Sequence, residues 1–119
     1  MPTARIRRVN EAVREVLSAH IAEDLSDPRI GFVTVTSVET SPDLRRARVY
    51  VSVLGDEAER EASLAGLRAA HGVLQGRMGR ELRIKRTPVL EFVYDESIDE
   101  GMRIEQLLAQ ELRDKDPGE

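Results

Sequence analysis

Cysteine and tryptophan are both absent from this chain of 119 residues. Without cysteine there is no disulfide, no thiolate metal ligand and no thiol nucleophile. No run approaches the roughly 18 apolar residues of a membrane span. The first residues, MPTARIRRVNEAV, lack the apolar stretch of a secretion signal. We therefore expect a soluble cytoplasmic protein that has no contact with a membrane.

The motifs of several catalytic classes are missing too. There is no G-x-S-x-G hydrolase elbow, no phosphate-binding P-loop and no EF-hand spacing. The densest group of carboxylates is Asp95, Glu96, Asp99 and Glu100. Two of these acids fall in the first turn of an expected helix, where the helix dipole favours them, so capping is the expected role and a cation site the alternative. We expect no enzyme activity, metal or cofactor.

Aromatic residues are limited to two phenylalanines and two tyrosines. Phe92 and Tyr94 have the pattern of core residues, which leaves no aromatic face of the kind on which RNA-recognition modules stack bases. A nucleic acid bound by this chain would therefore be recognised through its backbone and shape.

The charge of the chain, −4 overall, is unevenly distributed. Residues 1–90 hold 15 lysines and arginines against 12 acids, whereas residues 91–119 hold 3 against 10. A mildly basic body therefore carries an acidic end. All but two of the 18 cations are arginines, which suit bidentate phosphate contacts, although genome base composition would give the same bias.

Apolar periodicity predicts a helix over residues 4–25, with Thr3 as its N-cap and His20 as a half-buried structural residue. Two alternating stretches, 32–40 and 44–54, predict a β-hairpin joined by the Ser-Pro-Asp turn. Asp56 and Glu59 resemble a capping box that opens the next helical pattern, which continues to Leu82.

A third strand is predicted over residues 88–94, at a sheet edge because Pro88 cannot donate to a ladder. Ser97 and Glu100 resemble a second capping box before a helix over 98–112. The fold class is α+β, with the order α-β-β-α-α-β and an added C-terminal helix. We divide the chain into a domain of residues 1–96, a helical extension of 97–113 and a disordered acidic tail of 114–119.

Four glycines interrupt the helical pattern, namely Gly66, Gly72, Gly76 and Gly79. Each interior glycine costs a helix about 0.5–1 kcal/mol relative to alanine, so another benefit must offset them. Close packing, a kink, or the close approach of an RNA backbone would each do so.

Two positions compete for a break in this pattern. The sequence Gly76 to Gly79 matches the G-x-x-G loop with which KH domains clamp a nucleic-acid backbone. The apolar phase from Leu74 to Leu82 runs through it, which favours an unbroken helix there. The other candidate is Ala70 to Gly72, and residue patterns alone do not choose between them.

Longer stretches carry a family resemblance. They are RVNEAVREVLS, DPRIGFVTVTSVETSPDL, ARVYVSV and AAHGVLQGRMGRELRIKRTPVLEFVYDESIDEGMRI. Over roughly residues 8–104 the chain resembles bacterial ribosome-binding factor A. The resemblance implies a single KH-like domain with a three-stranded sheet, in which an Ala-x-Gly kink replaces G-x-x-G. Ala70, His71 and Gly72 stand at that position.

The resemblance also implies a function. Members of that family are non-enzymatic assembly factors that bind the small (30S) ribosomal subunit and its 16S rRNA late in maturation. They support processing of the rRNA 5′ end and growth in the cold. We expect a monomer. The alternative is a protein-interaction module that docks an acidic protein through its basic face, with the acidic end as an autoinhibitor.

The expected RNA-binding residues are Arg5, Arg7, Arg8, Arg45, Arg46, Arg48, Ala70, His71, Gly72, Arg77, Arg80, Arg83, Lys85 and Arg86. For any single arginine, a solvated and salt-bridged position is the other interpretation. His71 either approaches the RNA or is simply an exposed kink residue. If about six cations reach phosphates, log affinity should fall with log salt at a slope of about −4 to −5.

Overall fold

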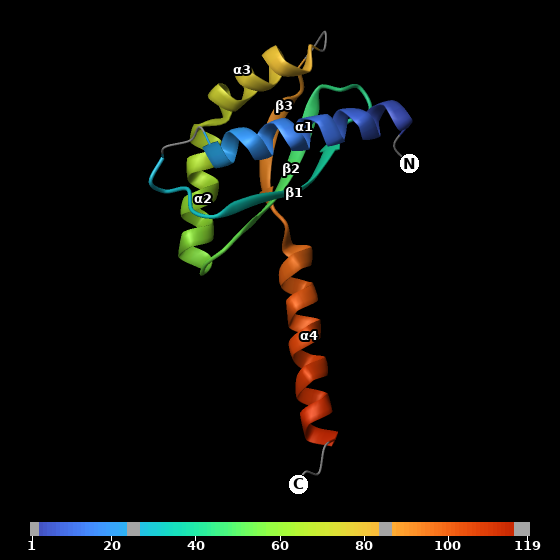
Figure 1. Cartoon of the computed structure of the whole chain (residues 1–119), viewed down its shortest axis with the longest axis vertical. Coiled ribbons are helices and arrows are strands. Elements are labelled where there is room, and N and C mark those ends of the chain that lie inside the picture. Colours follow the sequence, from blue (N-terminus) through green and yellow to red (C-terminus); the bar gives the residue numbers. More distant parts are fainter. Residues whose placement is uncertain (1–2, 24–26, 84–86, 116–119) are drawn as a thin grey trace.

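The structure, a computed structural model, describes residues 3–23, 27–83 and 87–115, and leaves aside the side chains of 23, 98–104 and 114–115. The elements are α1 (Ala4–Glu23), β1 (Val33–Thr40), β2 (Arg46–Val53), α2 (Glu57–Ala69), α3 (His71–Leu82), β3 (Val89–Tyr94) and α4 (Glu96–Lys115), as Figure 1 shows. The predicted α+β class and element order are confirmed. None of the described helices has the length and apolarity that crossing a bilayer requires.

Helix α1 begins and packs as its sequence predicts. The amide of Ile6 donates to the Thr3 hydroxyl oxygen at 3.2 Å, which satisfies one of the free donors of the first turn. On the apolar face Val13, Leu17 and Ile21 are buried in the core. This face holds α1 across the sheet (Figure 1).

The sheet has the order β1-β2-β3, antiparallel between β1 and β2 and parallel between β2 and β3. Strand β2 follows the predicted alternation, with residues 47, 49, 51 and 53 buried under the helices. Strand β1 does not, because a bulge between Val35 and Ser37 shifts its register. The bulge turns Val38 and Thr40 inward, where strict alternation would have put Ser37 and Glu39.

Strand β3 lies at the edge, as Pro88 predicted, and a side chain covers part of its outer rim. The Gln75 amide of α3 donates to the Pro88 carbonyl and accepts from the Leu90 amide, the latter at 3.1 Å. One glutamine thus makes the two-point contact that a further strand would make. It also ties α3 to the beginning of β3.

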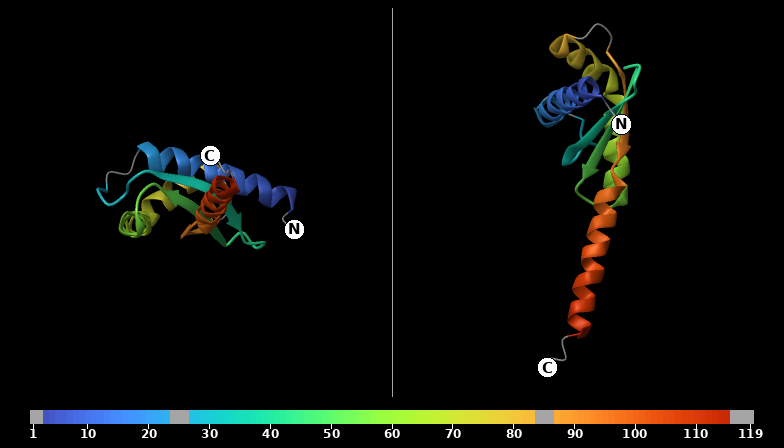
Figure 2. Two further views of the ribbon diagram at one scale, coloured as in Figure 1. Left: turned by 90° about the horizontal axis from the view of Figure 1, so that it is seen from below. Right: turned by 90° about the vertical axis from the view of Figure 1, so that its right-hand side faces the viewer.

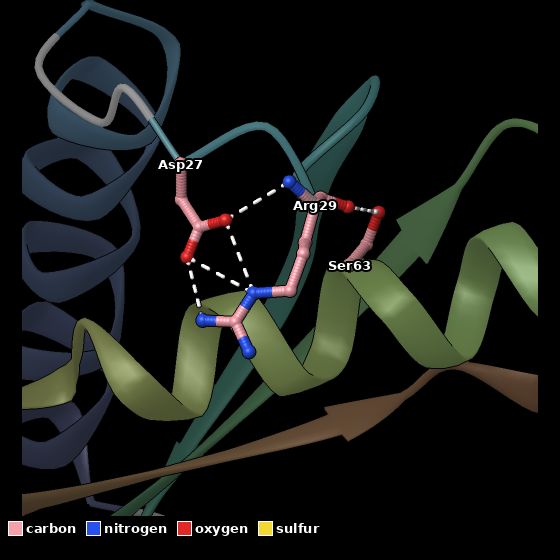
Figure 3. Close-up of polar contacts among 3 residues, drawn as sticks. All are labelled: Asp27, Arg29 and Ser63. Atoms are coloured by element: carbon pink, nitrogen blue, oxygen red, sulfur yellow. Dashed lines mark hydrogen bonds and ion pairs between the residues drawn. The ribbon is translucent and has the colours of Figure 1, made fainter.

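The loop between α1 and β1 is fixed against α2 (Figure 3). The Asp27 carboxylate accepts from the Arg29 amide at 2.9 Å and from its guanidinium at 2.7 Å. The hydrogen bond from the Arg29 side chain holds the pKa of Asp27 below its ordinary value. The Ser63 hydroxyl of α2 donates to the Arg29 carbonyl at 3.4 Å and accepts from the Gly31 amide at 3.1 Å. This loop therefore sets the position of the first residue of β1.

Helix α4 begins at Glu96, so the predicted N-cap at Ser97 is wrong, and the Glu100 side chain of the predicted capping box lies outside the described residues. Asp95 caps the helix instead, because its carboxylate accepts a hydrogen bond from the Ser97 amide at 3.0 Å. The same carboxylate accepts one from the Thr36 hydroxyl of β1 at 2.6 Å. The hydrogen bonds from Ser97 and then Thr36 lower the pKa of Asp95 below its ordinary 3.8. Both figures of the whole chain show α4 extending away from the domain (Figures 1 and 2).

Candidate nucleic-acid interface

The long helical pattern breaks at Ala70, not at the G-x-x-G sequence. Ala70 has φ −88° and ψ 1°, between α2 and α3, whereas Gly76 and Gly79 lie within α3. Hydrogen bonding continues across the break, from the Ala70 amide to the Gly66 carbonyl at 3.0 Å and from the Leu74 amide to the Ala70 carbonyl at 3.1 Å. The break is therefore a one-residue change of direction.

The packing of the two helices explains this change of direction. Helix α2 is tied to the edge strand, where the Arg68 guanidinium donates to the Phe92 carbonyl at 3.2 Å. Helix α3 contacts that strand only at its beginning, through Gln75, and packs mainly on α1, where the Glu81 carboxylate lies 2.6 Å from the His20 ring. A straight rod would not reach both surfaces. The half-buried His20 has the structural role that its position predicted.

The four glycines divide into two pairs. A Cβ at Gly66 would lie 2.6 Å from the Ile30 side chain, and one at Gly79 would lie 3.0 Å from the Thr87 hydroxyl. Close packing therefore explains these two. Around Gly72 and Gly76 nothing lies within 4 Å of the position of a Cβ. The two are exposed and four residues apart, so they form one bare face of α3.

Three basic segments lie at one end of the domain, in the upper part of Figure 1. They are the beginning of α1, the turn between β1 and β2, and the end of α3, which are far apart in sequence. The Val89 amide donates to the Arg45 carbonyl at 2.8 Å, which joins the hairpin turn to the segment after α3. The Thr40 amide donates to the Asn10 side chain at 2.9 Å, which joins the end of β1 to the first half of α1. Figure 2 shows the same grouping from the side.

Six of the predicted arginines are exposed at this end and have no ion pair with any described residue. We call them the basic end: Arg5, Arg7, Arg8, Arg46, Arg80 and Arg83. Arg83 ends α3 in the left-handed conformation, with φ 50°. Lys85 and Arg86 fall just after it and lie outside the described residues.

Three further predicted cations are less available. Arg45 lies 3.9 Å from the Asp43 carboxylate. Arg48 faces Glu39 across one strand pair and Glu91 across the other. A hydrogen bond with Tyr50, and then the charges of Tyr50 and Glu91, raise the pKa of Arg48 further above its ordinary value. Arg77 is half-buried. Arg45 and Arg48 are thus exposed but have acids beside them, and Arg77 is partly covered by packing.

A shallow depression of about 270 Å³ lies beside the kink. It is lined by Arg68, His71, Val89, Leu90, Glu91 and Phe92. His71 is exposed, and its Nδ1 lies 3.0 Å from the Arg68 carbonyl, to which a ring N–H donates. In the neutral ring this leaves Nε2 as an acceptor that a ligand can approach.

Sequence reasoning missed Gly76 as a candidate, because it treated the G-x-x-G sequence as a single motif. A sequence signal was present, because the apolar residues Leu74, Met78 and Leu82 leave Gly76 off the apolar face of the helix, where a glycine has no packing role.

Tyr94, expected in the core, is only half-buried, with the Arg60 guanidinium 3.8 Å from its ring centroid. Phe92 is fully in the core. Among the described residues, no three histidines or acids gather as metal ligands.

Known proteins share both the sequence and the fold. The family description of ribosome-binding factor A matches residues 5–108. A ribosome-binding factor A from Anaeromyxobacter sp. (strain K) is 56% identical over 105 residues, which cover 87% of this chain and 76% of that protein. The one from Brevibacillus brevis is 48% identical over 108 residues, which cover 91% and 89%.

Solved structures agree. The crystal structure of ribosome-binding factor A from Thermus thermophilus superposes with a TM-score of 0.67 at 30% identity, over 75% of this chain and 94% of that one. A homology model of the Thermus protein, fitted into an electron cryo-microscopy map of a 30S complex, gives 0.62 at 31% identity, over 73% and 91%. This chain therefore belongs to the ribosome-binding factor A family.

Proposed function

We propose that this protein is a non-enzymatic assembly factor that binds the small (30S) ribosomal subunit and its 16S rRNA during late maturation. One observation carries the proposal. Six exposed arginines from three segments share one end of the domain with a kinked helix pair that has a bare glycine face. This combination suits a folded RNA, whose phosphates and sugars are its most accessible groups.

The arginines supply charge in a form that fits phosphate. A guanidinium donates two parallel hydrogen bonds to a phosphate, and its charge is permanent. The bare face at Gly72 and Gly76 lets an RNA backbone approach α3 without meeting a side chain. His71 and the depression beside it lie next to this face and would receive a base or a sugar.

The family relationship supports the partner. The Thermus relative was fitted into a map of a complex with the 30S subunit. We extend that partner, and the roles in rRNA 5′-end processing and cold adaptation that the family resemblance implies, to this chain. A monomer that acts in the cytoplasm is part of the same proposal.

The alternative, in which the acidic end inhibits a basic docking face, receives no support from the position of α4. Helix α4 follows the end of β3, whereas the basic end lies at the beginning of β2 and β3. The helix extends away from that end (Figure 1). The basic end is therefore open to a large partner.

The test is a titration of the protein with purified immature small subunits at graded salt concentrations. With six phosphate contacts, the slope of log affinity against log salt should be about −4 to −5. A slope shallower than about −2 would point to a protein partner of the basic end and would contradict RNA binding. Mature subunits provide the control for preference, and tighter binding to the immature particle is expected.

A further inference from the structure

Helix α4 carries leucines that nothing in the described chain covers. Leu107, Leu108 and Leu112 are 59%, 54% and 69% exposed. In sequence they continue from Ile104 with the spacing i, i+3, i+4 and i+8, which is one stripe of a helix. Every described side chain from 105 to 113 is exposed. Most of the stability of a helix in a protein comes from packing of its apolar face, so a partner that covered this stripe would stabilise α4.

The domain of the same chain does not reach this stripe. Leu107 lies eleven residues after the start of α4, which places it about 16 Å along the helix axis. Figure 1 and the side view of Figure 2 both show the helix leading away from the sheet. A continuous α4 therefore keeps its leucines away from the domain.

The charge of this segment argues against RNA and against a second copy. Residues 96–119 contain eight acids and three bases. A net charge of this sign repels phosphates, and it would also repel an identical helix. The apolar stripe spans residues 104–112, whereas a coiled coil needs about three to four heptads.

A short stripe with acidic flanks fits another mode of recognition. An amphipathic helix that lies in an apolar groove uses anchors at i, i+3, i+4 and i+7, and needs no more than this length. Glu105 precedes Leu108 by three residues and is exposed on the flank of the stripe, so a cation at the rim of the groove would complement it. The family match ends at residue 108, whereas the stripe of leucines continues to Leu112.

We propose that α4 is a docking helix for a basic protein, which receives Leu107, Leu108 and Leu112 in an apolar groove with a cationic rim. This inference rests on the proposed function for the place of that protein, on the small subunit. The chain described here would then contact the small subunit through two surfaces of opposite charge. The basic end holds RNA, and the acidic helix holds protein.

The test compares two full-length variants. One replaces Leu107, Leu108 and Leu112 by glutamine, which favours a helix nearly as well as leucine does. The control replaces Gln106 and Gln110, which are exposed on the opposite face, by serine. Affinity is measured for intact small subunits and for protein-free 16S rRNA, with the helix content followed by circular dichroism and the molar mass by light scattering.

The leucine variant should bind intact subunits at least about tenfold more weakly, the loss expected for one well-packed anchor. Its affinity for protein-free rRNA should stay within about twofold of the wild type. The control should match the wild type on both. Unchanged subunit binding would overturn the docking helix, and an equal loss on free rRNA would assign α4 to RNA. A wild-type dimer that the leucine variant dissolves would make a second copy the occupant. Wild-type protein that binds neither particle nor rRNA would overturn the proposed function as well.

Discussion

Replacement of Arg46 and Arg80 by glutamine is expected to weaken binding to small subunits about 30-fold. The two residues are exposed on different segments of the basic end, Arg46 on β2 and Arg80 on α3. Each exposed charge-assisted contact with a phosphate contributes on the order of 1 kcal/mol, so the loss of two corresponds to about 30-fold in affinity. The salt slope should also become shallower by about 1.4–1.8, because two fewer phosphates are neutralised.

The matched control replaces Arg14 and Arg29 by glutamine, which changes the net charge by the same amount. Arg14 forms an ion pair with Glu11 on α1, and Arg29 forms one with Asp27 in the loop before β1, so both lie outside the basic end and outside α4. Affinity and salt slope should remain close to those of the wild type. If both pairs of substitutions weaken binding equally, net charge alone would explain the effect and the basic end would not be the interface.

Valine at Gly72 or Gly76 should separate binding from stability. Nothing lies near either position, so the free energy of unfolding should change by less than about 0.5 kcal/mol, and valine is a better helix former than glycine. Affinity for the small subunit should fall about tenfold or more, because a branched side chain would stand where the RNA backbone approaches α3. Urea unfolding and subunit binding measure the two effects on the same samples.

The same substitution at Gly66 should have the reverse effect. There a Cβ would lie 2.6 Å from the side chain of Ile30, which belongs to the loop before β1 and packs against the core. Overpacking of this kind costs about 1–3 kcal/mol, and it should lower stability while affecting binding mainly through the unfolded fraction. If valine at positions 72 and 76 also lowers stability and binding together, their glycines would have a packing role, and the bare face would lose its proposed purpose.

Most of the fold follows from local sequence signals. Thr3 caps α1, and Asp56 with Glu59 forms a capping box that caps α2, both as predicted. The alternation of residues 47–53 predicted the buried face of β2, and Pro88 predicted the edge placement of β3. These features depend on neighbouring residues, for which spacing is a sufficient guide.

The features that sequence patterns missed depend on tertiary contacts. The bulge after Val35 places Val38 in the core, and no glycine or other residue typical of a bulge marks its position in the sequence. Asp95, which caps α4 in place of Ser97, also accepts a hydrogen bond from Thr36 of β1, which lies 59 residues away in sequence. The helix break was predicted only in part, because residue patterns left two positions open and the family resemblance favoured Ala70 to Gly72, where the structure has it.

The candidate site was predicted as a set of residues, not as a surface. Spacing alone did not tell that the start of α1 and the end of α3 share one end of the domain. Neither did it tell that Arg48 lies between Glu39 and Glu91, or that Gly66 and Gly72 have different reasons to be glycine. These distinctions arise from cross-strand register and from packing, which a single sequence does not display.

The most direct measurement is photo-cross-linking from two exposed positions in the complex with immature small subunits. A photoreactive amino acid replaces Val73, which is 55% exposed beside Gly72, or Glu61, which is exposed on α2. Position 73 should cross-link to 16S rRNA and position 61 should not. Cross-links to protein alone from position 73, or equal rRNA cross-links from both positions, would contradict the interface.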